Sequence, residues 1–500
     1  MAKSSPYQVI RGGLVLDVDK ETAERSDLLI EGEKIIEVGS PGLAAPEGAT
    51  EVDAFDRLIT PGFVNSHTHG HGALGKGLGD KWTLELLLNA NPWASGSFRE
   101  EDLKLAAELN AAEMVLKGST AAYDMCFEFP SPTLGGIKAL GEGYQAVGVR
   151  ALIAPMMADT TLYRAIPGLI DALPEPHKAR AEKMAATDHQ THLAACAKIL
   201  EDWPFDRNRI MPGLGPTIPL HCSDDFIRGA RDLAADYSIG VQMHLAESKV
   251  QAVAGMKRYG KTLTAYLESL GLLSDRFTAA HGIWLDDEDL KRLAAHGAGV
   301  AHNPASNLRL GSGVAPAREM LDHQLKVGIG TDGSISSDNQ NMFEAMRAAA
   351  YVSRIASPDP DRWLGAWDVL RMGSVGGAEL MGLSGKIGRI APGYFADLVF
   401  LDLANVNFVP FNNAANQIVN SEDSSAVDTV MIGGRTVLSG RQFTEFDFAD
   451  LRRRVEQTIA RLNAESIGKK EPFEAMAEFV SRHCVGLSCS HYHVERRLPH

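Results

Sequence analysis

The sequence has little positive charge. Its 49 lysines and arginines stand against 64 aspartates and glutamates, for a net charge of −15. Nucleic acids require a basic binding face, so this balance argues against DNA or RNA as a partner. No apolar run reaches the length of a membrane-spanning helix, and no membrane partner is expected. With 45% hydrophobic and 23% charged residues, the composition is that of an ordinary globular chain with ample core.

Cysteine is also scarce, with five residues in 500. These are Cys126, Cys196, Cys222, Cys484 and Cys489. An odd and scattered set does not predict a disulfide framework. The N-terminus passes directly into strand-like sequence at Tyr7, without the apolar region of a signal peptide. We therefore expect a protein of the reducing cytoplasm.

Several catalytic signatures are missing or misplaced. The His-x-Glu and Pro-Cys-x-x-Cys pair of one zinc deaminase class does not occur, nor do His-Glu-x-x-His and Gly-x-Ser-x-Gly. Residues 255–262 match a phosphate-loop pattern but lie inside an amphipathic stretch rather than after a strand. Residues 328–333 match Gly-x-Gly-x-x-Gly, yet they follow several α/β pairs and contain Asp332, which better suits a metal site. Phosphate binding is therefore not predicted.

A His-x-His pair, His67 and His69, ends a run of mostly apolar and small residues that begins at Pro61. Such a run is typical of a buried strand with a polar tip. Residues i and i+2 of a strand project from the same face, so both imidazoles can reach one ion. Because imidazole is the commonest neutral metal ligand, the pair is a candidate metal site.

Three more strand-like runs end in metal-competent residues. The run 239–243 leads to His244, with Glu247 three residues further on. The runs 277–280 and 326–331 lead to His281 and Asp332. Short parallel strands with polar residues at their C-terminal ends, separated by helical stretches, are typical of the active face of a (β/α)8 barrel. The four runs together predict an α/β fold with a TIM barrel.

The order of the runs along the chain predicts the domains. Strand-like runs in residues 1–60 and 385–440 predict one small β-sandwich domain built from both termini. Residues 61–384 alternate strands and helices and predict the barrel, with strands three and four at 151–154 and 210–215. Residues 441–500 predict a helical extension and a tail.

Four of the strand-end residues form a ligand set for one divalent metal with room for water. They are His67, His69, His244 and Asp332. A bound ion lowers the pKa of water toward ~7, which makes hydroxide available at neutral pH. His281 can hold or deprotonate that water, Asp332 can also take its proton, and Glu247 can carry a proton to a substrate nitrogen.

The motifs together resemble the amidohydrolase superfamily. They are Pro61–His69, His244–Glu247, His281-Gly282, Asn303–Leu308 and Gly330–Gly333, and they span roughly residues 7 to 437 in the family's order. The similarity is to the mononuclear branch that includes S-adenosylhomocysteine/methylthioadenosine deaminases, guanine deaminase and triazine hydrolases. It implies a barrel with a flanking β-sandwich, the four metal ligands above, and proton transfer by Glu247 and His281. Zinc is the usual ion of this branch, and iron is the alternative.

One metal is expected rather than two. Binuclear barrels of this kind bridge their ions with a carbamylated lysine or a carboxylate on a middle strand. Neither Lys nor Glu occurs in residues 151–154 or 210–215. The tail, with Cys484, Cys489, His491 and His493, has residue types for a second metal site elsewhere. The alternative is an extended tail that packs on a neighbouring subunit.

Two departures from adenosine-type members concern the substrate. Their Gly-Pro-His motif after strand four reads Gly215-Pro216-Thr217 here, and the loop after strand one reads Asp80–Glu85 where they carry an acidic residue that grips ribose. These differences favour a substrate other than a nucleoside. The candidate substrate contacts are Trp82, Thr217 and Asn307; Trp93, Phe127 and Met156 are further candidates for the wall of a pocket for a flat heterocycle.

The resulting hypothesis is a metal-dependent deaminase. Water replaces an amino group on a small-molecule nitrogen heterocycle, and ammonia leaves. Removal of chloride or of a substituted amine, or opening of a cyclic amide, is the alternative within hydrolases. A non-catalytic amidohydrolase scaffold is the alternative outside them, although no ligand is lost. A homodimer or homotetramer is expected.

Overall fold

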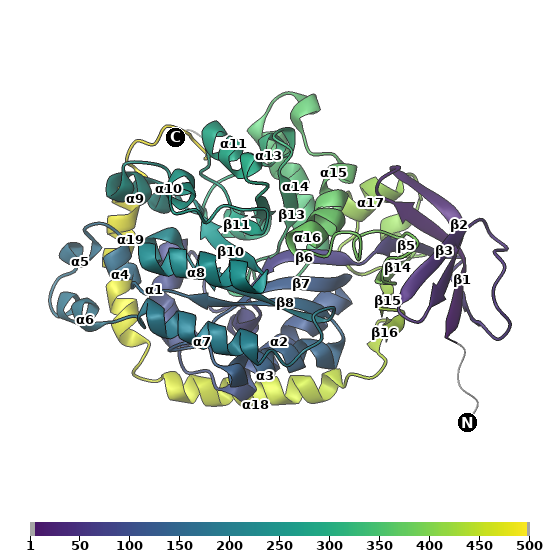
Figure 1. Cartoon of the computed structure of the whole chain (residues 1–500), viewed down its shortest axis with the longest axis horizontal. Helices are drawn as coiled ribbons and strands as arrows, with labels where there is room; N and C mark the ends of the chain where they lie inside the picture. Colours follow the sequence, from purple (N-terminus) through teal and green to yellow (C-terminus); the bar gives the residue numbers. More distant parts are fainter. Residues whose placement is uncertain (1–5, 498–500) are drawn as a thin grey trace.

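A parallel sheet of eight strands forms the centre of the protein, in a computed structural model that describes residues 6–497 (Figure 1). Its strands are neighbours in chain order: β6 (Phe63–Thr68), β7 (Ser119–Cys126), β8 (Arg150–Met157), β9 (Ile210–Pro216), β10 (Gly240–Leu245), β11 (Phe277–His281), β12 (Gly299–His302) and β13 (Lys326–Ile329). Beyond the last strand, Asp332 N donates to His67 O at 2.9 Å, so the two edges of the sheet meet. The predicted barrel is confirmed.

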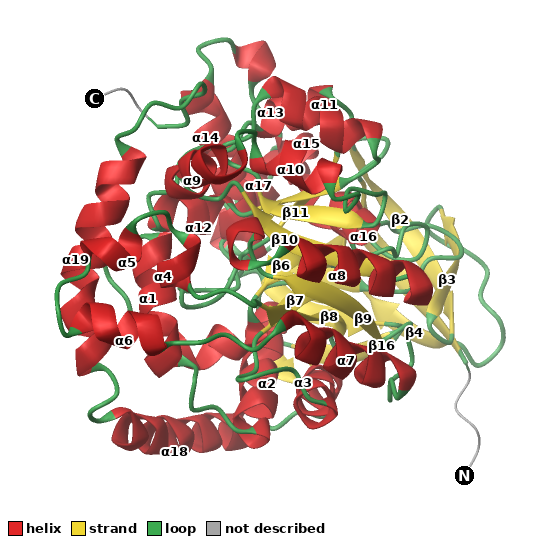
Figure 2. Cartoon of the chain, turned by 60° about the vertical axis from the view of Figure 1, so that its left-hand side comes forward, coloured by secondary structure: helices red, strands yellow, loops and turns green. Residues whose placement is uncertain are grey.

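Helices cover the outside of the barrel strands (Figure 2). The longer ones are α2 (Glu100–Leu116), α3 (Leu134–Val147), α7 (His189–Glu201), α8 (Asp224–Tyr237), α9 (Lys249–Tyr259), α11 (Asp287–Ala295) and α14 (Met342–Ala356). In α8, the Ser223 side chain caps the first turn by accepting from Phe226 N, and Phe226, Ile227 and Ala230 bury one face. This spacing fixes which side of the helix faces the barrel.

Shorter helices lie in the connections. They are α1 (Leu84–Ala94), α4 (Leu162–Ala165), α5 (Leu169–Ala172), α6 (His177–Lys183), α10 (Leu263–Ser269), α12 (Pro304–Arg309), α13 (Ala317–Asp322), α15 (Ala366–Arg371), α16 (Gly377–Leu380) and α17 (Ala414–Asn420). Several follow the C-terminal ends of barrel strands, where loops carry the functional residues of this fold. Among residues 6–497, no helix is both long and apolar enough to cross a lipid bilayer.

The second sheet has nine strands and is built from both ends of the chain, as predicted. Its N-terminal strands are β1 (Tyr7–Asp17), β2 (Thr22–Glu31), β3 (Lys34–Gly39), β4 (Thr50–Asp53) and β5 (Arg57–Pro61). Its C-terminal strands are β14 (Leu398–Asp402), β15 (Val427–Ile432), β16 (Arg435–Ser439) and β17 (Gln442–Phe443). Strand β14 pairs antiparallel with β5, which joins the two sets. The sheet packs its own apolar core, which includes Ile10, Leu28 and Phe400.

A buried ion pair connects the barrel to this β domain. Arg150, at the start of β8, places Nε 2.8 Å from Oδ2 of Asp397, and both side chains are buried. The Asp397 carboxylate also accepts from Gly433 N at 2.7 Å, and Arg150 donates to Asn208 O at 2.7 Å. Because each charged group has several hydrogen-bond partners within the protein, the ion pair is satisfied without contact with water.

The C-terminal residues form two helices, α18 (Phe448–Ser466) and α19 (Glu471–Ser488), that run along the outside of the barrel (Figure 1). The tail that follows packs on its own chain rather than extending away from it. Tyr492 is buried against Trp284, and Arg496 O accepts from Val314 N at 2.8 Å. Residues 489–497 thus contact their own barrel, and packing of the tail on a neighbouring subunit stays a prediction.

Candidate active site

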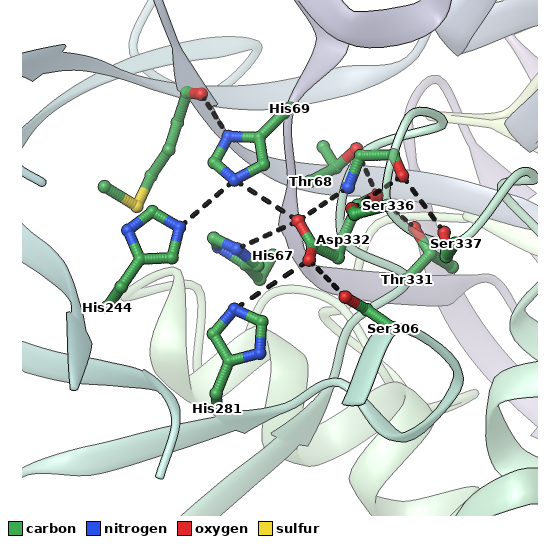
Figure 3. A network of polar contacts seen from close by, with 12 residues as sticks. His67, Thr68, His69, His244, His281, Ser306, Thr331, Asp332, Ser336 and Ser337 are labelled. Carbon is green, nitrogen blue, oxygen red and sulfur yellow. Dashed lines mark hydrogen bonds and ion pairs between the residues drawn. The ribbon is translucent and has the colours of Figure 1, made fainter. Parts of the chain in front are cut away.

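Five side chains from four barrel strands converge at the C-terminal end of the barrel (Figure 3). They are His67, His69, His244, His281 and Asp332. His67 lies on β6 with His69 just beyond it, His244 lies on β10, His281 ends β11 and Asp332 follows β13. The four strands are parallel, so their C-terminal ends deliver these groups to one place.

Each of the four imidazoles donates its Nδ1–H to a carbonyl oxygen inside the protein. The acceptors are Gln242 Oε1 for His67 (2.7 Å), Met125 O for His69 (2.7 Å), Thr217 O for His244 (2.8 Å) and Asn307 Oδ1 for His281 (2.8 Å). A carbonyl oxygen can only accept, so Nδ1 carries the ring proton. Nε2 is therefore the nitrogen of each ring that is left to bind a metal, and hydrogen bonds of this kind from the opposite nitrogen are typical of metal-bound histidines.

The Nε2 atoms lie too close together for neutral rings without a cation. His69 Nε2 is 3.1 Å from His244 Nε2. Burial lowers the pKa of His69 to about 4 and the pKa of His244 well below its usual value, so no extra proton sits between them at neutral pH. His67 Nε2 is buried without a hydrogen-bond partner among the described residues. A divalent cation bound by these lone pairs satisfies all three nitrogens.

Asp332 brings a carboxylate to the same point. Its Oδ1 lies 3.5 Å from His67 Nε2 and 3.2 Å from His69 Nε2. Burial alone would raise the pKa of Asp332, but the neighbouring histidines hold it well below its usual value. Ser306 Oγ donates to Oδ2 at 2.6 Å and Gly333 N donates to Oδ1 at 2.7 Å, which fixes the carboxylate.

The backbone is strained at these strand ends. Asp332, His281 and Ala246 have φ values of 61°, 72° and 50°, in the left-handed region that non-glycine residues rarely adopt. Such strain persists where the surrounding structure holds it, and it concentrates at functional sites. Ala246 lies between His244 and Glu247, so the turn aims both of these side chains.

Glu247 stands beside His281 with one free oxygen. Its Oε2 is 3.7 Å from His281 Nε2 and has no hydrogen-bond partner within residues 6–497. Burial, with the nearby charges of Asp332 and Glu85, raises the pKa of Glu247 well above its usual value. The same burial lowers the pKa of His281 to about 4. Burial therefore favours the uncharged form of both groups, an acid beside a base.

The metal-competent groups define one centre. Among the described residues, all clusters of three or more metal-competent side chains share members: His67, His69 and His244; His67, His281 and Asp332; and His244, Glu247 and His281. The tail residues Cys484, Cys489, His491 and His493 form no such cluster. His493 instead pairs with Asp286 at 2.6 Å. The prediction of a second metal in the tail therefore finds no support here.

A cavity of about 380 Å³ adjoins the imidazole cluster. Thr217, Phe127 and Met156 line it, as expected from the sequence. Trp82 is not among its lining residues but packs edge-on against Trp93, with ring centroids 6.5 Å apart. Asn307 uses its amide oxygen to hold His281, while its buried Nδ2 has no partner among the described residues, so a substrate contact through Nδ2 stays a prediction.

Three residues at the site were not predicted. Gln242 and Ser306 hold His67 and Asp332, and His71 accepts from Phe127 N at 3.1 Å beside the cluster. Gln242 could have been found, because it lies two residues before His244 on the same strand face. Ser306 lies within the motif 303–308, whereas His71 falls in a 3-10 turn (Gly70–Gly75) after the strand has ended.

Comparison with known sequences places this site among related proteins. Residues 58–437 match the profile of the Amidohydrolase family. A 5-methylthioadenosine/S-adenosylhomocysteine deaminase of Pyrococcus abyssi is 32% identical over 441 residues, which cover 88% of this chain and 95% of the relative. A 5'-deoxyadenosine deaminase of Methanobrevibacter smithii is 28% identical over 460 residues, covering 92% and 98%.

Solved structures share the whole architecture. An adenosine deaminase from Xanthomonas campestris with bound zinc has a TM-score of 0.81 at 26% identity, covering 91% of this chain and 98% of that one. Atrazine chlorohydrolase from Arthrobacter aurescens TC1, complexed with zinc, has a TM-score of 0.80 at 26% identity, covering 90% and 99%.

Proposed function

The chain belongs to the amidohydrolase family, and we propose that it is a metal-dependent deaminase. In the proposed reaction, water replaces an amino group on a nitrogen heterocycle and ammonia is released. The observation that carries this proposal is the set of four Nδ1–H donors, which leaves the Nε2 atoms available at one centre together with Asp332 and Glu247. Metal ligands and a proton donor at one point suit hydrolysis with an amine leaving group.

We propose zinc as the ion, held by His67, His69, His244 and Asp332. Three neutral imidazoles and one carboxylate are a donor set that zinc favours, and the buried Nε2 of His67 otherwise lacks a partner. When bound, a divalent ion acts as a Lewis acid and makes hydroxide available near neutral pH. Two structural neighbours are described with zinc, which supports the choice.

Three side chains handle protons in the proposed mechanism. Glu247 donates its proton to a ring nitrogen of the substrate and recovers a proton from the new hydroxyl group as the carbonyl forms. His281 is neutral with its lone pair on Nε2, so it accepts a hydrogen bond from the attacking water and orients it. Asp332 accepts the proton that the water loses and passes it to the departing amine, while Ser306 holds its second oxygen.

The names of the relatives support an aminoheterocycle as substrate. The two curated relatives described above deaminate adenosine derivatives by name, and so does the Xanthomonas campestris structure. The test is ammonia release by the zinc-loaded protein from a panel of aminopurines, adenine nucleosides, pterins and aminotriazines. The chelated protein and the same protein with zinc restored are the controls. No ammonia from any compound, with zinc bound, would refute the proposal.

Hydrolytic dechlorination is the second candidate. It is favoured by the similarity to atrazine chlorohydrolase over 90% of this chain. The same site could remove chloride or a substituted amine from a triazine, because the attack on an electron-poor ring carbon is common to all these reactions. Chloride release from a chlorotriazine, measured beside ammonia release, separates the two activities.

A further inference from the structure

His221 is a buried imidazole without a hydrogen-bond partner. It ends a short 3-10 turn (Pro219–His221) after β9, and only 6% of its surface is exposed. Its backbone is satisfied, since its N donates to Ile218 O and its O accepts from Thr160 N. Its ring lines the 380 Å³ cavity, and neither ring nitrogen is hydrogen-bonded within residues 6–497. Its two ring nitrogens are therefore available to a molecule in the cavity, as one donor and one acceptor.

The other ionisable side chains in the wall are already occupied. The Glu128 carboxylate accepts from Thr133 N at 2.8 Å and from Thr133 Oγ1 at 2.7 Å. His192 uses both ring nitrogens, one with Ser131 Oγ at 3.1 Å and one with Ala158 O at 3.2 Å. These groups hold the wall together. His221 is thus distinguished from them by its free nitrogens.

The cavity reaches the imidazole cluster through Thr217. This residue lines the cavity four positions before His221, and its carbonyl oxygen accepts from His244 Nδ1 at 2.8 Å. Thr217 is therefore the residue that the cavity wall shares with the surroundings of the cluster. His221 lines the same cavity and brings an imidazole to its wall.

The cavity suits an uncharged polar group. No lysine or arginine is among its lining residues, so a carboxylate there would meet no cation. Burial, with a smaller effect from Arg258, lowers the pKa of His221 to about 4, so the ring is neutral at pH 7. A neutral imidazole has one donor and one acceptor, which is the complement of a hydroxyl group. The surrounding Phe127, Met156 and Leu162 provide apolar contact on either side.

We propose that His221 is a specificity-determining residue, which hydrogen-bonds an uncharged hydroxyl-bearing substituent on the substrate ring, such as a ribose. This inference rests on the proposed deaminase function. The motif Gly215-Pro216-Thr217 favoured a substrate other than a nucleoside. This inference revises that expectation, because His221 provides an imidazole for a nucleoside at another position of the same cavity. Substrates with a charged amino-acid substituent, such as S-adenosylhomocysteine, are disfavoured.

The test compares His221→Leu with the wild-type enzyme on matched nucleosides. Adenosine and 5'-methylthioadenosine carry ribose hydroxyls, 2',3'-dideoxyadenosine lacks them, and S-adenosylhomocysteine adds charge. We expect His221→Leu to raise KM for the first two by roughly 10- to 100-fold, because a buried hydroxyl loses its partner. KM for the dideoxy compound should change little, and His221→Asn should recover part of the loss. The wild-type enzyme should prefer 5'-methylthioadenosine to S-adenosylhomocysteine.

His192→Leu is the matched control in the same wall. It should lower Tm, because it breaks two internal hydrogen bonds, and leave the ratio of KM for adenosine to that for the dideoxy compound unchanged. His221→Leu should keep Tm and zinc content, since it removes no internal bond. An active enzyme whose KM values do not respond to His221→Leu or His221→Asn overturns this inference alone. An active enzyme that accepts only heterocycles without hydroxyl groups also overturns this inference alone. A zinc-loaded enzyme that deaminates nothing overturns the proposed function as well.

Discussion

The Nδ1–H of His281 donates to Oδ1 of Asn307 at 2.8 Å, which fixes the tautomer of the imidazole. The lone pair is then on Nε2, which lies 3.7 Å from Glu247 Oε2 and 3.9 Å from Asp332 Oδ2. A ring free to exchange tautomers would, in its other tautomer, present an N–H donor instead of a lone pair to these two carboxylates. Asn307, which lies on α12 after strand β12, therefore acts through His281.

His281→Asn should be a catalytic lesion rather than a folding one. Asparagine keeps the approximate size but has no basic nitrogen, so kcat/KM should fall by roughly 10²- to 10⁴-fold. Strand-end residues of a barrel serve chemistry, while stability resides in the packed interior. Thermal unfolding and metal analysis should give wild-type values, and His323→Asn, on the outer surface, is the control. Loss of the metal or unfolding would make His281 a ligand or a structural residue.

The barrel and its metal-competent residues could be predicted because they share one local signal. A buried strand that ends in a polar residue is visible in sequence, and parallel strands in a barrel bring such ends together. His67, His244 and His281 were found in this way. Residues that act from turns gave no such signal. His221 lies in a 3-10 turn and Tyr492 in the tail, and their positions depend on contacts distant in the chain.

The roles of some predicted residues depended on packing that no local pattern encodes. Asn307 was expected at the substrate, yet its amide oxygen is taken by His281. Trp82 was expected in the pocket, yet its ring packs against Trp93. In both cases the residue type is compatible with either use, and only the orientation of the side chain shows which contacts it makes; a substrate contact of Asn307 through its unpartnered Nδ2 stays a prediction.

Glu247→Gln should keep the metal and lose most turnover. The amide preserves the shape of the side chain but cannot donate and recover a proton, so kcat should fall by roughly 10²- to 10⁴-fold. Glu422→Gln is a matched control, because Glu422 is also buried but accepts from Ala426 N at 2.9 Å, in the connection before β15. Steady-state kinetics and metal analysis of both variants provide the measurement. Near-normal kcat in Glu247→Gln would remove this residue from the mechanism.

Metal analysis should find about one tightly bound divalent ion per chain. Every metal-competent cluster among the described residues shares one centre, and strands β8 and β9 carry no lysine or glutamate to bridge a second ion. Removal by a chelator should lower Tm, because an ion that binds only the folded state stabilises it. Activity should return on adding one equivalent of zinc. Two ions per chain, both required for turnover, would contradict the single-metal site.

Breaking the Arg150–Asp397 pair should destabilise the whole protein. Asp397→Ala leaves the fully buried guanidinium without its charge partner, which typically costs about 3–5 kcal/mol of unfolding free energy. The double variant Arg150→Met/Asp397→Leu should recover much of the loss, because it leaves no unpaired charge. Arg452→Ala, which breaks an exposed pair with Glu456, should cost below about 1 kcal/mol. Urea unfolding of the metal-loaded variants measures each value, and equal costs for the single and double variants would contradict this account.

Tyr492→Ala should show that the tail is part of the folded barrel. The Tyr492 ring is buried edge-on against Trp284, with centroids 6.2 Å apart. The backbone N of Trp284 donates to Ala246 O at 2.9 Å, and its Nε1 donates to Ser312 O at 2.9 Å, so Trp284 ties together the loops that follow β10 and β12. Removing a buried aromatic ring typically costs about 3–5 kcal/mol, and a lower Tm is expected.

Tyr492→Phe is the control for this last prediction, because it keeps the ring and removes only a hydroxyl that lies 3.4 Å from Trp284 O. A contact of that length is weak, so the change in unfolding free energy should stay below about 1 kcal/mol. Because the Trp284 loop also supports Ala246, beside Glu247, Tyr492→Ala should lower kcat as well as Tm, whereas Tyr492→Phe should leave both near wild type. Thermal unfolding and steady-state kinetics test this directly. If Tyr492→Ala unfolds at the wild-type temperature, the tail does not contribute to the stability of the barrel.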